Sequence, residues 1–217
     1  IHVYNPATGW IQNCNSTPFT VSGQSSPDKS KFPNYMAPDA ENARGIHAIK
    51  VLEKETGFTL DKLIASAYDS YLPGFEKLLP SFIKAYDELA PGNDTLRSKY
   101  AEPIQLVRNW DLRYSVSSVP TTLSIYWAFR LRQNTLSKIP AGLDQLRIIA
   151  WLQTETSSGE KVKALAEAVT ELQRDFGSWK QPWGEVNRFQ RLGGEINAGF
   201  DDQQPSLAVP FTSSFWG

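Results

Sequence analysis

The feature that most constrains the fold of this chain is a long run of helical patterns in its middle. Between residues 40 and 180, apolar residues recur every three or four positions, in segments separated by Gly or Pro. The clearest segment begins with Ser157 and Glu160, which have capping-box spacing, and ends at Gly177. We therefore predict a block of helices over residues 40–180.

Six further helices are predicted within this block. The first starts near Asp39, with Asp39 or Asn42 as its cap, and ends at Gly57. The second follows Thr59 as its N-cap. The other four are predicted at residues 75–89, 104–110, after Pro120, and 145–152.

The segments on both sides of the block lack this helical pattern. Residues 1–39 and 181–217 are predicted to be strand and loop, with candidate strands at 183–189 and 206–212. A stable sheet needs several strands and covered edges, and these few strands lack partners within the chain. We therefore predict an α+β fold in which a helical block interrupts a sheet that lies largely outside this chain, and we treat residues 1–217 as one fragment.

Composition limits the classes of partner. The 22 basic and 23 acidic residues nearly cancel, so no nucleic-acid partner is indicated. The sequence contains no apolar run long enough to span a bilayer, so we expect no membrane partner. The one cysteine, Cys14, excludes an intrachain disulfide. Because the chain starts at Ile1 and its one methionine is Met36, we expect a further segment to precede it.

Common catalytic motifs are missing from the sequence. It has no Gly-x-Ser-x-Gly nucleophile elbow and no glycine-rich phosphate loop. His2, His47 and Cys14 do not have the spacing of a zinc site. We therefore expect no cofactor and no metal.

An amide-rich segment near the N-terminus is the strongest chemical signal. The apolar pair Trp10-Ile11 leads into Gln12, Asn13 and Asn15, with Pro18 beyond. On an extended chain, Asn13 and Asn15 would face the same way. An amide held at a strand end can donate a hydrogen bond to an oxyanion, although Asn15 could equally cap a turn next to Pro18.

Two segments resemble anchors of the penicillin amidase family, which are N-terminal-nucleophile hydrolases with an αββα sandwich. The first is Trp10–Pro18, with its Asn-x-Asn pattern, and the second is Tyr35–Ala48, with an arginine at the head of a helix. Trp110-Asp111 and Pro182–Arg188 are similar to the acylase branch that includes acyl-homoserine-lactone and aculeacin-type acylases. The resemblance implies that the chain is an internal fragment of the large subunit.

The resemblance also implies roles for two residues. Asn15 corresponds to the asparagine that stabilises the oxyanion, and Arg44 to the helix-head arginine beside the nucleophile's amino group. Ile1 cannot be the nucleophile, so the N-terminal serine is expected from outside this chain, and the fragment alone should be inactive. Asp39 is a candidate for the family's calcium ligand. Taken without the resemblance, Arg44 could be a surface helix residue.

The same resemblance sets expectations for the intact protein. It would hydrolyse a linear amide, such as an N-acyl-homoserine lactone, a penicillin side chain or a lipopeptide acyl group. Its partners would be the remainder of the large subunit and the small subunit of one self-cleaving precursor, in the periplasm or secreted. The alternative is a non-catalytic helical module that binds a hydrophobic ligand or partner through its aromatic residues.

Overall fold

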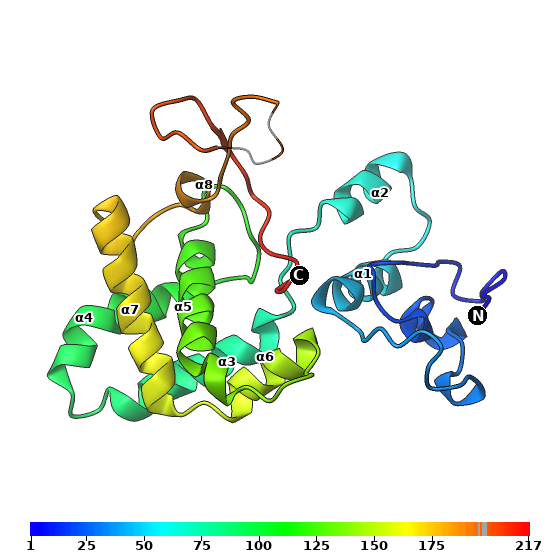
Figure 1. Cartoon of the computed structure of the whole chain (residues 1–217), viewed down its shortest axis with the longest axis horizontal. Coiled ribbons are helices and arrows are strands. Elements are labelled where there is room, and N and C mark those ends of the chain that lie inside the picture. The colour runs from blue at the N-terminus through cyan, green and yellow to red at the C-terminus, as the bar shows by residue number, and fades with distance from the viewer. Residues whose placement is uncertain (195, 197–198) are drawn as a thin grey trace.

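The computed structural model describes residues 1–194, 196 and 199–217. Within these residues the chain is mostly helical (Figure 1). The α-helices are α1 (Ala43–Lys54), α2 (Leu60–Ala67), α3 (Phe75–Leu89), α4 (Asp94–Arg108), α5 (Val119–Thr135), α6 (Gln145–Thr154), α7 (Ser158–Phe176) and α8 (Trp183–Val186). Short 3-10 turns occur at Pro18–Thr20, Gly23–Ser25, Lys29–Lys31 and Leu136–Lys138.

The main core lies where α3, α5 and α7 pack together (Figure 1). Phe82 on α3 stacks on Trp127 on α5, with ring centroids 4.1 Å apart. The indole Nε1 of Trp127 donates to the backbone carbonyl of Lys161 on α7, at 3.0 Å. A stacked aromatic pair and one satisfied polar atom therefore join the three helices at the centre of the block.

The capping signals confirm several predicted helix boundaries. Helix α3 has the predicted bounds, and α7 has the predicted capping box, in which Ser157 and Glu160 each bond the other's backbone N–H. The predicted stop at Gly177 is confirmed, because this residue takes the left-handed conformation at φ +76°. Asn42, one of the two predicted caps, accepts the Gly45 N–H and starts α1.

The predicted start of α4 was wrong by ten residues. The helix begins at Asp94, where the Asn93 side chain accepts the Leu96 N–H, and it continues through Pro103. A proline inside a helix lacks one N–H donor and crowds the preceding turn, but it does not always end the helix. Here the ring of Pro103 is buried, so packing offsets that cost.

The strand predicted within residues 1–39 was also wrong. That segment consists of loops and 3-10 turns, and a single ladder-like bond joins the Gln12 N–H to the Val21 carbonyl at 2.9 Å. Asn15 has φ +53°, so the chain is not extended there, and the extended geometry from which Asn13 and Asn15 were expected to face the same way is absent. A strand needs a continuous partner, and this segment has none among the described residues.

The predicted C-terminal strands are confirmed in small part. The segment from Trp183 begins as the short helix α8, followed by strand β1 (Arg188–Phe189), which pairs antiparallel with β2 (Leu207–Ala208). Each strand has two residues, and they form the one sheet among the described residues. The larger parent sheet stays a prediction.

The C-terminal segment returns to the start of α3 (Figure 1). Trp216 is buried and stacks on Phe75 with ring centroids 4.8 Å apart, and its carbonyl accepts the Gly74 N–H at 2.8 Å. A Cβ at position 74 would lie 2.8 Å from that same carbonyl oxygen, so the contact requires glycine. The segment therefore closes the end of the core that faces α1.

Candidate functional site

The backbone of the Asn-x-Asn segment forms a tight turn. The Asn15 N–H donates to the side-chain oxygen of Asn13 at 3.0 Å. Asn15 itself takes a left-handed conformation that asparagine tolerates better than most residues, and it is exposed. Asn13 therefore orients the peptide of Asn15, and the Asn15 carboxamide lies on an exposed turn.

The N-cap of α1 joins this turn to the helix. The Asn42 side-chain nitrogen donates to the carbonyls of Cys14 at 3.0 Å and Asn15 at 3.2 Å, while its oxygen accepts the Gly45 N–H at 2.9 Å. One asparagine thus caps the helix and fixes the turn against it. The structure in this way brings the two sequence anchors together through a residue that was expected only as a cap.

Gly45 allows the close approach of these segments. It is buried, and a Cβ there would lie 2.0 Å from the Glu41 carboxylate and 2.9 Å from the Ser16 hydroxyl. The Glu41 carboxylate accepts the Asn42 N–H at 2.8 Å and the Thr20 hydroxyl. The space that glycine leaves is therefore filled by a carboxylate that ties the N-terminal loop to the head of α1.

Arg44 lies in the first turn of α1 and is half-buried. Its Nε is buried and has no hydrogen-bond partner among the residues that the structure describes. It lines a cavity of about 290 Å³ together with Cys14, His47, Asp69 and Gly217, which we call the Arg44 cavity. Burial raises the pKa of the Cys14 thiol, and the positive charge of Arg44 opposes that rise.

The two predicted site residues therefore have different settings. Arg44 faces a cavity, whereas Asn15 does not line it and is tied to the helix through its own carbonyl. The arrangement places a permanent cation and a carboxamide at one helix head, and both groups can stabilise a developing negative charge. The catalytic role of either residue stays a prediction.

Sequence reasoning missed a polar cluster beside this cavity. His47 Nε2 donates to the Asp69 carboxylate at 2.7 Å, and Arg113 Nη1 donates to the other oxygen of that carboxylate at 2.9 Å. His47 had no assigned role, although it follows Arg44 by one helical turn on the same face. Asp69 and Arg113 belong to other segments, so no local pattern could have paired them with His47.

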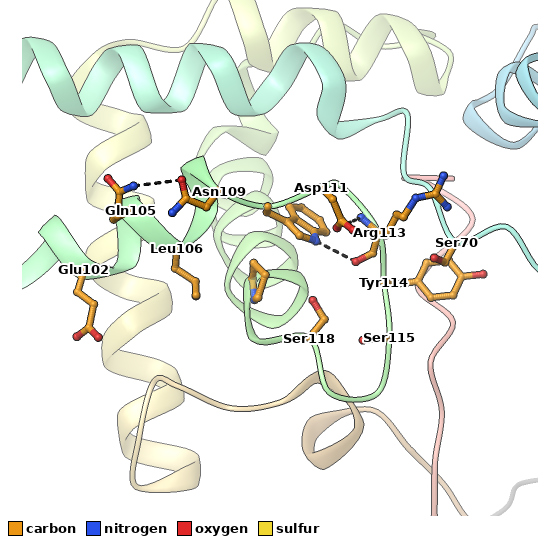
Figure 2. A pocket seen from close by; sticks show the side chains of 12 residues that line it. Ser70, Glu102, Gln105, Leu106, Asn109, Asp111, Arg113, Tyr114, Ser115 and Ser118 are labelled. Atoms are coloured by element: carbon orange, nitrogen blue, oxygen red, sulfur yellow. Dashed lines mark hydrogen bonds between the residues drawn. The ribbon is translucent and has the colours of Figure 1, made fainter.

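A larger cavity lies on the far side of Arg113. It has a volume of about 780 Å³ and is lined by α4, the loop that follows it and the start of α5 (Figure 2). Trp110 Nε1 donates to the Arg113 carbonyl at 2.9 Å, and the Asp111 carboxylate accepts the Arg113 N–H at 3.0 Å. Neither Asn15 nor Arg44 lines this cavity.

A comparison with protein families decides the identity of the chain. The family described as penicillin amidase matches residues 1–208, which is nearly the whole length. The chain belongs to the penicillin amidase family. The suspected family is thus confirmed, and because its members are hydrolytic acylases, the chain is part of an amidohydrolase at the level of the family.

The calcium role suggested for Asp39 stays a prediction. Asp39, the candidate calcium ligand, is an exposed residue. Over the described residues, no three His, Cys, Asp or Glu side chains gather in a way that could hold a metal ion. In the same part of the chain, no helix combines the length and the apolar character that a membrane crossing requires.

Proposed function

We propose that this chain supplies the oxyanion-stabilising part of an amidohydrolase that cleaves a linear amide. In this proposal the Asn15 carboxamide donates to the oxyanion, and Arg44 provides a fixed positive charge. The observation that carries the proposal is the pair of hydrogen bonds from Asn42 to the carbonyls of Cys14 and Asn15, which holds the Asn-x-Asn turn at the helix head that bears Arg44. Membership of the penicillin amidase family supports it.

The attacking group would come from another part of the same precursor, as an N-terminal serine. Its hydroxyl oxygen forms a bond to the amide carbon as the carbonyl π bond breaks and its electrons move to the oxygen, while the serine's own α-amino group takes the hydroxyl proton. That proton then passes to the amine as the C–N bond breaks, and water hydrolyses the acyl-enzyme that remains. An α-amino group has an ordinary pKa near 7.7–8.0, and a nearby cation favours its neutral form. Arg44 would thus help to keep the base unprotonated, because its guanidinium is always charged.

The substrates we propose are amides that join an acyl chain to a small polar nucleus, such as an N-acyl-homoserine lactone, a penicillin or an acylated peptide. The remainder of the large subunit and the small subunit would complete the acyl pocket. We place the intact protein in the periplasm or outside the cell, following its family. The chain by itself is expected to show no amide turnover, because its first residue, Ile1, has no nucleophilic side chain.

Two substitutions at Asn15 in the intact protein test the role of its carboxamide. Both Asn15→Ala and Asn15→Gly remove the donor, but glycine tolerates φ +53° and alanine does not. Loss of one oxyanion donor typically lowers kcat about 10²–10³-fold. We expect losses of this size in both variants, measured by steady-state kinetics on an amide substrate.

The glycine variant separates catalysis from structure. If Asn15 served only the left-handed turn, Asn15→Gly would keep the activity of the parent enzyme while Asn15→Ala lost it, and the proposal would fail. Asn34→Ala is the matched control, since Asn34 is another exposed asparagine of the N-terminal segment. It should leave kcat and KM unchanged.

A further inference from the structure

Three polar side chains from separate segments meet at the edge of the Arg44 cavity. Asp69, which follows α2, accepts hydrogen bonds from His47 on α1 at 2.7 Å and from Arg113, after α4, at 2.9 Å. It also accepts the Tyr71 N–H at 3.1 Å. His47 and Asp69 line the Arg44 cavity and a neighbouring cavity of about 330 Å³, and Arg113 lines the latter.

Asp69 is held as a carboxylate at this junction. Burial raises its pKa, but the hydrogen bonds from His47, Arg113 and the Tyr71 N–H outweigh that effect and lower it. Because the ionised carboxylate can only accept, His47 Nε2 must carry the hydrogen of the shared bond. The contact is therefore directional, and it joins α1 to a charged group of the helical block.

Several polar bonds help to fix α1 against the rest of the chain. Of its residues, only Ala43 and Gly45 are buried, and its apolar residues Ile46 and Ile49 are half-buried. The Ala43 N–H donates to the side chain of Gln145 at 2.9 Å, and Lys50 pairs with Glu76. The bond from His47 lies between these two, one turn after Arg44.

On the other side of the junction, backbone hydrogen bonds hold the loop that carries Arg113. Leu112 has φ +62°, a strained conformation for a leucine, and its carbonyl accepts the Leu72 N–H at 2.9 Å. The Tyr114 N–H donates to the Ser70 carbonyl at 3.1 Å. These two bonds bracket Arg113 and hold its loop against the segment that follows Asp69.

From these contacts we propose that Asp69 is a positioning residue for amide hydrolysis. It fixes His47, and through the first turns of α1 it sets where the Arg44 guanidinium and the turn at Asn15 lie. This inference rests on the proposed function, because its effect on turnover requires Arg44 and Asn15 to act in the reaction. Asp69 does not touch the reacting atoms.

The test uses the intact enzyme and two measurements. In Asp69→Asn, a displaced helix head should lower kcat on the order of 10²-fold, the size of effect that a misplacement of about 1 Å can cause. KM should stay within about twofold, since Asp69 does not bind the substrate. The second measurement is the rate of Cys14 alkylation by iodoacetamide, which should rise at least about fivefold as the half-buried thiol becomes accessible.

Further variants separate positioning from folding. His47→Ala should reproduce both effects without removing a charge from the helical block, and it serves as the second probe if Asp69→Asn does not fold. His47→Gln keeps an N–H donor at a similar reach and should recover most of the lost kcat. Asp87→Asn is the matched control, because Asp87 is an exposed carboxylate that pairs with Arg108 within the helical block.

The outcomes distinguish this inference from the proposed function. An unchanged alkylation rate in both Asp69→Asn and His47→Ala overturns the inference, whatever the kcat. Faster alkylation with unchanged kcat also overturns it, provided that Asn15→Gly impairs the same enzyme. If Asn15→Gly is fully active, the proposed function fails, and alkylation alone then decides whether Asp69 positions α1.

Discussion

Substitution of Gly45 by alanine tests how closely the N-terminal loop approaches α1. In an ordinary helix interior, alanine is more stable than glycine by about 0.5–1 kcal/mol. Here the new methyl group would lie 2.0 Å from the Glu41 carboxylate, so that side chain must move away. It would then lose its bonds from the Asn42 N–H and the Thr20 hydroxyl.

The magnitudes decide the sign of the change. Each lost bond to a charged group costs about 1.5 kcal/mol at the low end, which applies to a partly exposed carboxylate. Two such bonds outweigh the helix-propensity gain, so Gly45→Ala should destabilise the chain by about 2 kcal/mol. For a chain of this size the melting temperature should fall by roughly 4–8 °C. Urea denaturation and hydrogen exchange of the α1 amides measure the change.

A double-mutant cycle isolates the cause. In a Glu41→Ala background no carboxylate opposes the new methyl group, and the Ser16 hydroxyl, which has no hydrogen-bond partner among the described residues, can rotate. Gly45→Ala should then stabilise the protein by up to about 1 kcal/mol. The reasoning is refuted if Gly45→Ala is stabilising while Glu41 is present.

Two further predictions concern the helical block. Hydrogen bonds from the Lys138 ammonium and from Ser157 lower the pKa of Glu160 to about 2. The stability that the ionised Glu160 contributes is therefore present above pH 4.5 and is lost as the pH falls toward 2. Glu160→Gln should lower the free energy of unfolding by about 1 kcal/mol at pH 7, and urea titrations should show that the difference vanishes near pH 2. Trp127→Phe should cost about 2–3 kcal/mol by calorimetry, since it removes buried volume and the donor to the Lys161 carbonyl, and a loss below 0.5 kcal/mol would contradict the packing described.

The helices could be predicted where local signals agree. The bounds of α3 follow from its apolar stripe and the flanking Pro-Gly pairs, and α7 follows from Ser157, Glu160 and Gly177. The predicted helix at 104–110 was too short because Pro103 is a local stop signal in the sequence. Only the burial of Pro103 in the folded chain explains why α4 continues through it. Local sequence patterns do not report the free energy that burying the Pro103 ring contributes.

The strand predicted near the N-terminus failed for a different reason. The segment at Trp10-Ile11 has strand-like composition, but a strand is defined by its partner, and composition does not supply one. The positive φ of Asn15 is likewise invisible in the sequence, since asparagine adopts both extended and left-handed conformations.

The candidate site was predictable in its parts and not in its connections. Asn42 was recognised as a helix cap, but its second role, which is to hold the carbonyls of Cys14 and Asn15, requires the folded loop. Asp69 and Arg113 are 44 positions apart, and no periodic pattern links them. Such pairs become visible only when the topology is known.

The contact between Trp216 and Phe75 has a consequence for folding kinetics. These rings stack across about 140 positions of intervening sequence, and closing so long a loop is entropically costly, although each doubling of its length adds only about 0.6 kcal/mol. The local contacts within the block need no such closure and should form earlier. Refolding should therefore end with the seating of Trp216 beside Gly74, and until that step the wall of the Arg44 cavity that Gly217 supplies would still be missing.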